Sequence, residues 1–530
     1  MNAVGYRQLW AANPGGWRAA GAAWAGLTGP VRGRVDGLGG AAGRLRGGWS
    51  GAAATAADTR LGGLRDELAS VTPALIEADQ VLADLAGRLV AAKARLGEAV
   101  ALADAAGLVV DRAGGVHVDP ARVQPTERTG VATARVAAAL RDALDRAGAA
   151  DRAAADRLDE LARAAASGWA SPPPPGRPDP GASPTVVRAW WSGLTPAQRR
   201  WLVLREPALV GHLDGVPVAA RDQANRLLLG SRRAELLAER QRLLARVPPG
   251  PVASVRLRAV AARLAGLDAL AERLTSAGEP RAYLLGLDPA GEGRVVVALG
   301  DPDQADRVLT YVPGTTAGLD DAPGDLGRAA RVLDRCAALA PGERSAAVLW
   351  LDYDAPDFLH EAASAGQARD ASPALHRFQE GLRATHEGPP ARQTVLGHSY
   401  GSLVVGMTAR EHGLAADALV FVGSPGVGAG NAGELGVPPG EVWASRAPDD
   451  VIRLARPVDE LGREALFGTT PLAAVLGWPD RTGHELWFGH DPADSGFGGR
   501  VFRSGRGGHS GYWDPGNPAL DGMARIVLGR

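Results

Sequence analysis

The chain has 530 residues, which is enough for about three domains of ordinary size. Its 58 basic and 59 acidic residues give a formal charge of -1, a balance that favours neither a nucleic-acid partner nor an anionic membrane. The single cysteine, Cys336, excludes an internal disulfide framework and a cysteine-based zinc site. No signal-peptide pattern and no long charge-free apolar stretch occurs, so we expect no integral membrane segment and no cleaved signal.

The first part of the chain, residues 1–168, has helical periodicity and predicts an all-α domain. Apolar residues recur from Leu68 to Leu96 at alternating spacings of three and four, as in a heptad seam. A second helical pattern over 14–60 is interrupted at Trp49-Ser50-Gly51. We therefore predict two antiparallel helices that meet at this Trp-x-Gly turn.

Two short apolar runs around Gly114-Gly115 predict a small β-hairpin over 108–118, followed by a helix over about 127–166. Residues 169–184 are rich in proline and too poor in apolar side chains to form a core, so we interpret them as a semi-rigid linker between domains.

Residues 185–275 return to a helical pattern and are expected to pack on the domain that follows. Thr195 and Pro196 have the residue types of a helix N-cap and a first helical position.

From about residue 276 to the end, runs of strand type alternate with helical runs. This alternation predicts an α/β domain with a mostly parallel, doubly wound sheet and helices on both faces. The runs 283–287 and 294–299 are close enough in the chain to form a hairpin. The predicted strands are 283–287, 294–299, 307–312, 346–351, 393–396, 418–422 and 441–444.

The strongest chemical signal is Gly397-His398-Ser399-Tyr400-Gly401, which follows an apolar strand and precedes a helical run. In a nucleophile elbow, the serine occupies a strained turn that exposes its hydroxyl, and glycines two positions away on either side let the strand and helix approach closely. The sequence therefore predicts Ser399 as a nucleophile, and His398 as a residue that packs against the sheet.

A serine nucleophile needs a base, and in hydrolases of this type an acid and then a histidine follow the serine in the chain. Asp449 and Asp450 come just after the predicted strand 441–444. Asp450 is the first choice, and Asp449 stays open as the alternative or as a helix cap. His509, in a glycine-rich loop before the last helix, is the predicted base. His484 and His490 are the other downstream histidines, and His490 is interpreted as a structural residue.

Acyl transfer also requires two backbone amides directed at the developing oxyanion. One is expected from Tyr400, the residue after the nucleophile, and the other from Thr315 or its neighbour Thr316, in the Pro-Gly turn after the strand 307–312. No phosphate-loop lysine follows the glycines at 423–430, and no histidine accompanies Asp352-Tyr353-Asp354, so neither a cofactor nor a metal is expected.

From about residue 185 to the end, the sequence resembles a family of actinobacterial α/β hydrolases of unassigned substrate. That resemblance implies an α/β-hydrolase fold, a nucleophile at Ser399, an acid at Asp450 and a base at His509. It rests on several separated blocks: Trp190-Trp191, Gly211 to Pro217, Tyr311 to Thr315, Trp350 to Pro356, the elbow, Gly423 to Gly426, Trp487 to Gly489, Phe497-Gly498 and His509 to Trp513.

Through Trp49-Ser50-Gly51 and its long paired helices, the N-terminal part resembles the Trp-x-Gly helical hairpins associated with type VII secretion. This resemblance implies a small helical partner and export without a cleaved signal; a cytoplasmic location stays open. The leading hypothesis is a serine hydrolase, an esterase or lipase-like enzyme acting on a small-molecule ester or acyl substrate. The alternative is a secretion-linked binding or effector scaffold whose hydrolase domain is not catalytic.

Overall fold

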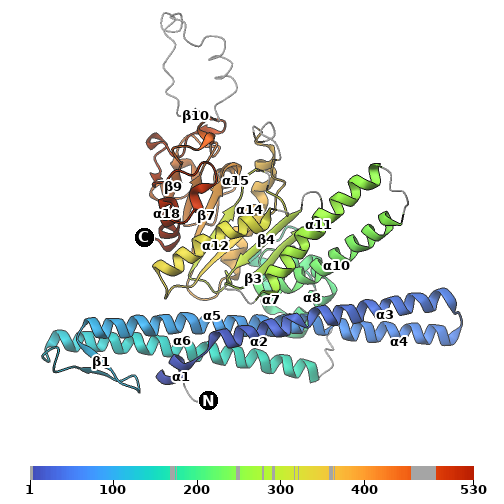
Figure 1. Cartoon of the computed structure of the whole chain (residues 1–530), viewed down its shortest axis with the longest axis horizontal. Coiled ribbons are helices and arrows are strands. Elements are labelled where there is room, and N and C mark those ends of the chain that lie inside the picture. The colour runs from blue at the N-terminus through green and yellow to red at the C-terminus, as the bar shows by residue number, and fades with distance from the viewer. Residues whose placement is uncertain are drawn as a thin grey trace, which may run out of the picture.

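Figure 1 shows the computed structural model of the chain, in which a long helical rod lies against a compact α/β domain. The structure describes residues 4–166, 174, 176–245, 251–276, 280–288, 290, 293–315, 317–319, 321–356, 362, 364–454 and 485–530. Within these residues, no helix is both long and apolar enough to cross a membrane.

The rod is formed by the N-terminal helices. Its elements are α1 (Tyr6–Ala11), α2 (Pro14–Gly26), α3 (Thr28–Gly48), α4 (Ala52–Ala69), α5 (Val71–Ala105), β1 (Leu108–Val110), β2 (Val116–Val118) and α6 (Glu127–Ala166). The predicted hairpin and the predicted helix over 127–166 are therefore confirmed.

The rod is held together by a narrow apolar seam. Leu85, Leu89 and Leu96 of α5 are buried against Val136 and Leu140 of α6, and the other contacts of the seam are made mostly by alanines. Small residues let the helix axes approach closely, so a seam of few large side chains can still exclude water.

The residues 49–51 separate α3 from α4, which pack side by side (Figure 1). Gly51 has φ +120, a backbone conformation that favours glycine.

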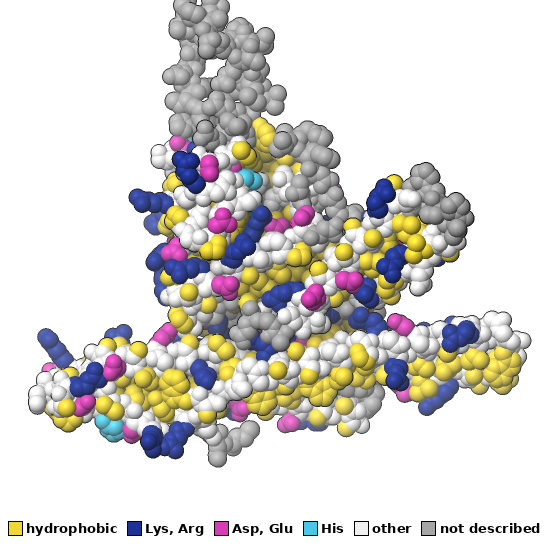
Figure 2. Space-filling view, viewed as in Figure 1, with side chains coloured by type: hydrophobic (Ala, Val, Ile, Leu, Met, Phe, Trp, Pro, Cys, Tyr) yellow, Lys and Arg dark blue, Asp and Glu magenta, His cyan; other side chains and the backbone are white. Residues whose placement is uncertain are grey.

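The first two helices of the rod, α1 and α2, carry partly exposed tryptophans. Trp10, Trp17 and Trp24 recur every seven residues and are 42%, 46% and 47% exposed, and yellow side chains follow the N-terminal helices in Figure 2. A row of half-exposed tryptophans is unusual for a surface without a partner. The small helical partner itself stays a prediction.

Five further helices connect the rod to the sheet: α7 (Pro184–Gly193), α8 (Pro196–Arg205), α9 (Pro207–His212), α10 (Val218–Leu244) and α11 (Pro251–Thr275). The predicted cap is confirmed, because the backbone amide of Gln198 donates to the Thr195 hydroxyl and Pro196 occupies the first helical position. In the proline-rich segment, the Gly176 carbonyl accepts a hydrogen bond from the indole of Trp190 at 3.0 Å.

The main sheet has eight strands in the order β12-β9-β8-β7-β5-β6-β4-β3. β3 and β4 form the predicted antiparallel hairpin, β4 pairs antiparallel with β6, and all other neighbours are parallel. This confirms the predicted α/β fold. The strands are β3 (Ala282–Asp288), β4 (Arg294–Leu299), β5 (Arg307–Val312), β6 (Ser345–Leu351), β7 (Arg392–His398), β8 (Ala418–Val422), β9 (Val442–Ser445) and β12 (Arg500–Val501).

Helices cover both faces of this sheet (Figure 1). α12 (Ala322–Leu339) packs with α18 (Pro518–Leu528) on one face, and α14 (Gly366–Thr385) packs with α15 (Tyr400–Glu411) on the other. The chain leaves β5 for β6 on one side and then crosses back to β7 on the other side. The carboxyl ends of β5 and β7 therefore flank a topological switch point, where ligand sites of α/β sheets are found.

The rod contacts the α/β domain through buried polar groups. Asp222 of α10 is fully buried and accepts hydrogen bonds from Arg226 at 2.8 Å, from Gln80 of α5 at 2.8 Å and from the Leu284 amide of β3 at 2.7 Å. Arg281 pairs with Asp222 and with Asp79 of α5. One carboxylate thus joins the rod, the connecting helices and the sheet.

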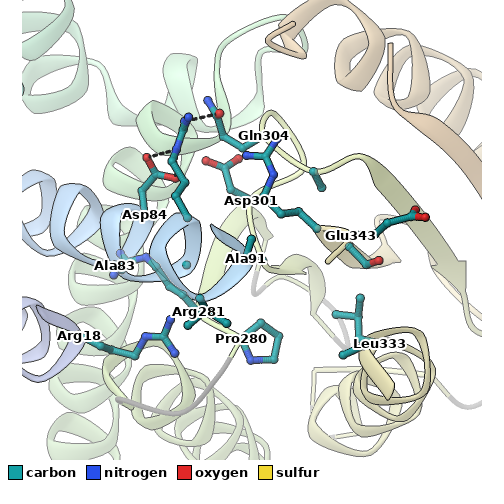
Figure 3. Close-up of a pocket in the computed structure, with 18 of the residues that line it drawn as sticks. Arg18, Ala83, Asp84, Ala91, Pro280, Arg281, Asp301, Gln304, Leu333 and Glu343 are labelled. Atoms are coloured by element: carbon teal, nitrogen blue, oxygen red, sulfur yellow. Dashed lines mark hydrogen bonds and ion pairs between the residues drawn. The ribbon is translucent and has the colours of Figure 1, made fainter. Parts of the chain in front are cut away.

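A cavity of about 300 Å³ lies beside this contact, between α5 and the loops at the amino ends of the strands (Figure 3). Arg88 of α5 lines it and donates to Asp84 and to Gln304. The cavity is at the end of the strands opposite the switch point, because it is lined by Arg281, just before β3, and by Ser345, the first residue of β6.

We predict that Asp222→Ala lowers the free energy of unfolding by about 3–5 kcal/mol, since it leaves Arg226 and Arg281 buried without their shared carboxylate. Urea unfolding followed by circular dichroism measures this. The matched control is Asp268→Ala, whose partner Arg233 is largely exposed, with an expected cost below about 1 kcal/mol. Equal costs for the two variants would contradict the proposed role of Asp222.

Candidate active site

Ser399 lies between β7 and α15 with φ 53 and ψ -129. Among the described residues it is the one non-glycine residue with a positive φ. A side chain in this conformation stores strain that the surrounding packing must hold, and such outliers concentrate at functional sites.

The two elbow glycines make this turn possible. A Cβ at Gly397 would lie 2.6 Å from the backbone of Ser402, and a Cβ at Gly401 would lie 2.3 Å from the carbonyl oxygen of Val312 on β5. Both distances are far shorter than a carbon atom tolerates, so only glycine lets β7, α15 and β5 approach this closely.

His509 and Asp450, predicted as base and acid, are in contact. The His509 Nδ1 lies 2.9 Å from one carboxylate oxygen of Asp450 and 3.1 Å from the other. Asp450 is fully buried and also accepts hydrogen bonds from the Tyr512 hydroxyl and the Ile452 amide. Burial alone would raise the pKa of Asp450, but the hydrogen bonds from His509, Tyr512 and Ile452 outweigh it and lower that pKa, which keeps the carboxylate ionised.

Asp449 has a different position. Its carboxylate accepts hydrogen bonds from the amides of Gly507 and Gly508, each at 3.2 Å, and so anchors the loop that carries His509. Of the two adjacent acids, Asp450 is the one that contacts the imidazole.

The end of β8 leaves room for the Asp450–His509 pair. Gly423 has φ +57, and a Cβ there would lie 2.9 Å from an Asp450 carboxylate oxygen and 3.2 Å from the His509 ring. Glycine at position 423 is therefore explained by the space that the Asp450–His509 pair needs. The sequence already disfavoured a phosphate loop at this position.

His398 contributes more than packing against the sheet. Its Nε2 donates to the backbone carbonyl of His509 at 2.9 Å, and its ring lies 4.8 Å from the His509 ring and 5.0 Å from that of Trp513. Burial and the neighbouring His509 lower the pKa of His398 to about 3, so it is a neutral donor at ordinary pH. Neither the bond of His398 to the His509 carbonyl nor the bond of Tyr512 to Asp450 was predicted.

Ser399 and His509 line one groove of about 250 Å³ at the carboxyl ends of β5 and β7. Gly314 and Thr315 line it just after β5, and a Cβ at Gly314 would lie 3.0 Å from the Ser399 hydroxyl oxygen. The Tyr353 hydroxyl holds this turn by donating to the Pro313 carbonyl at 2.6 Å. Glycine thus lets the backbone approach the nucleophile closely.

Tyr400, whose amide is the other predicted oxyanion donor, begins α15, and its hydroxyl donates to the Ser364 carbonyl at 2.6 Å. His490 lies 3.2 Å from Asp494 and outside the groove lining. His484 and Thr316 lie outside the described residues. Among the described residues, no three acidic, histidine or cysteine side chains gather as a metal site would require.

Comparison with known proteins agrees with the α/β fold. Residues 288–459 match the sequence profile of a family described as "Alpha/beta hydrolase". An uncharacterized protein of Mycobacterium tuberculosis (strain ATCC 25618 / H37Rv), Rv0963c, is 36% identical over 220 residues, covering 39% of this chain and 79% of the relative. The chain belongs to the alpha/beta hydrolase family.

A longer uncharacterized protein of the same strain, Rv2079, is 32% identical over 380 residues, covering 66% of this chain. This chain spans 56% of that relative's length. The crystal structure of esterase PE8 aligns with 43% of this chain at 15% identity and a TM-score of 0.27. The family profile, which matches residues 288–459 of this chain, includes Ser399 and Asp450 and ends before His509.

We predict that His398 makes the stability of the hydrolase depend on pH. Because the unfolded imidazole takes up a proton near pH 6.5 and the folded one only near pH 3, stability is fully present above pH 6.5 and is lost as pH falls toward 3. Between pH 6.5 and 4, the wild type should lose roughly 3 kcal/mol more unfolding free energy than His398→Gln. Urea unfolding at each pH measures the difference.

The control for this comparison is His412→Gln, which changes an exposed histidine. It should follow the wild-type pH dependence. A His398→Gln variant with the same pH dependence as the wild type would show that the folded imidazole takes up its proton at an ordinary pH.

Proposed function

We propose that this protein is a serine hydrolase that cleaves carboxylic esters through an acyl-enzyme on Ser399. One observation carries the proposal. A serine held in a strained turn shares its groove with an imidazole whose Nδ1 contacts a buried carboxylate, Asp450. This arrangement has the roles of a nucleophile, a general base and the acid that orients the base.

The proposed reaction has two steps. His509 takes the Ser399 hydroxyl proton as the oxygen attacks the ester carbonyl, and then gives that proton to the departing alcohol. Water next attacks the acyl-enzyme with His509 again as base, which releases the carboxylic acid and restores the serine. Asp450 stabilises the imidazolium formed in each step, and the amides of Tyr400 and Thr315 donate to the oxyanion.

The close approach of Gly314 to Ser399 supports the assignment of the Thr315 amide as an oxyanion donor. It brings the backbone of the Pro313–Thr315 turn to the nucleophile, opposite the amino end of α15. The partial positive charge of a helix N-terminus favours negative charge at the same place.

We predict that a fluorophosphonate probe at neutral pH labels the wild type covalently and does not label Ser399→Ala, because the probe requires an activated serine oxygen. Mass spectrometry of the intact protein measures the label, and p-nitrophenyl butyrate measures hydrolysis. Circular dichroism establishes that both proteins are folded. Folded wild type without a label would contradict the proposal and favour the alternative of a non-catalytic scaffold.

The neighbouring acids provide a matched pair of variants. Asp450→Asn should lower kcat on p-nitrophenyl butyrate by about 10² to 10⁴, because the imidazole loses its orienting carboxylate. Asp449→Asn keeps that contact and loosens only the loop amides, so we expect less than about a tenfold effect. A larger loss for Asp449→Asn than for Asp450→Asn would exchange the two assignments.

A further inference from the structure

The groove beside Ser399 is polar on nearly every side. Eleven described residues line it, and Ala317 supplies its one apolar side chain. The others are the site residues, two glycines, and the polar side chains of Thr315, Asp321, Asp325, Arg328 and Ser510. An alkyl chain placed here would remove these polar groups from water and offer them no hydrogen bond in return.

Arg328 and Asp325 form a fixed polar wall on α12. The Arg328 guanidinium donates to Asp325 at 2.8 Å, and Asp325 also accepts from the Tyr311 hydroxyl at 3.1 Å. The face of the Trp513 ring lies 5.2 Å from the guanidinium carbon. Two neighbours, Tyr311 and Trp513, thus hold the pair in one orientation before any ligand arrives, which lowers the entropy cost of binding.

Arg328 of this wall and the neighbouring Asp321 keep hydrogen-bonding capacity. Among the described residues, the hydrogen bonds of Arg328 to protein run through Nη1, which leaves Nη2 and Nε as donors. Asp321 is the N-cap residue of α12, yet its exposed side chain makes no capping hydrogen bond. The groove therefore offers cationic donors and free carboxylate acceptors together.

This combination of one cationic and two acidic side chains favours some substrate groups over others. Asp321 and Asp325 outnumber Arg328, so an anionic substrate group would meet net negative charge. A hydroxyl group both donates and accepts, and adjacent hydroxyls can satisfy Arg328 and Asp321 at once. A neutral polyol fits the groove better than an alkyl chain or a second carboxylate does.

We infer that the groove lined by Asp321, Asp325 and Arg328 binds a hydroxyl-rich alcohol portion of the substrate, so that the enzyme is an esterase of short-chain polyol or sugar esters. This inference rests on the proposed function and adds the class of its substrate. The volume of about 250 Å³ limits the bound portion to a small group.

The test compares two esters with the same acyl group, glycerol monobutyrate and n-butyl butyrate. Wild type should favour the glycerol ester by about tenfold or more in kcat/KM, since a site built to hydrogen-bond hydroxyls rejects an analogue that lacks them. Asp321→Ala should reduce this preference several-fold through a higher KM for the glycerol ester. Asp334→Ala changes an exposed acid on the same helix outside the groove and should keep the wild-type preference.

Equal or faster hydrolysis of n-butyl butyrate, or no hydrolysis of the glycerol ester, by wild type that hydrolyses p-nitrophenyl butyrate would overturn the inference and leave the serine-hydrolase proposal standing. The same preference in wild type, Asp321→Ala and Asp334→Ala would also overturn it. Wild type that neither takes the fluorophosphonate label nor hydrolyses any of the esters would instead defeat the proposed function.

Discussion

The strained backbone at Ser399 is the constraint on which the rest of the site depends. A positive φ at a serine costs on the order of 1–3 kcal/mol, and it persists only where the surroundings leave no alternative. Here β7 and α15 meet without space for a Cβ at Gly397 or Gly401, and β5 closes the third side. The sheet order brings these three elements together, so the whole α/β domain holds one side chain in place.

A second constraint orients the imidazole. The loop around His509 is tied from two directions, because Asp449 binds the amides of Gly507 and Gly508 while His398 binds the His509 carbonyl. Asp450 then needs to fix only the ring itself. The two adjacent acids after β9 therefore have different roles. Asp449 holds the backbone of the His509 loop, and Asp450 holds the His509 side chain.

The connection between the rod and the α/β domain also depends on a buried carboxylate that several donors share. Asp222 joins α10, α5 and β3 through charged and neutral donors. Its contact with the sheet is on β3, the edge strand, which β4, β6 and β5 separate from β7. The contacts of Asp222 therefore stabilise the attachment of the rod without entering the groove.

The elements that the sequence predicted well are those with a strong local signal. Short apolar runs located the seven longer strands of the main sheet and helical periodicity located the long helices, and the glycine spacing around Ser399 predicted the elbow. The two-residue strands β10 (Glu485–Leu486), β11 (Gly489–His490) and β12 were missed, because two residues have no period.

The supports of His509 could not be predicted from local patterns. The role of His398 arises only when β7 and the loop after β12 are adjacent, and that of Tyr512 only when this loop meets Asp450 in the loop after β9. The choice between Asp449 and Asp450 had the same difficulty, since consecutive residues share one sequence context and differ only in the direction of their side chains. The buried contact of Asp222 with Gln80 spans 142 residues and depends entirely on the tertiary fold.

The most direct test of this account is a crystal structure of the protein after reaction with a fluorophosphonate. We predict a covalent phosphonate on the Ser399 oxygen, with its phosphoryl oxygen about 3 Å from the amides of Tyr400 and Thr315 and His509 still bound to Asp450. A phosphonate attached to another residue, or a phosphoryl oxygen directed away from both amides, would contradict the central claim that this strained turn is the centre of an acyl-transfer site.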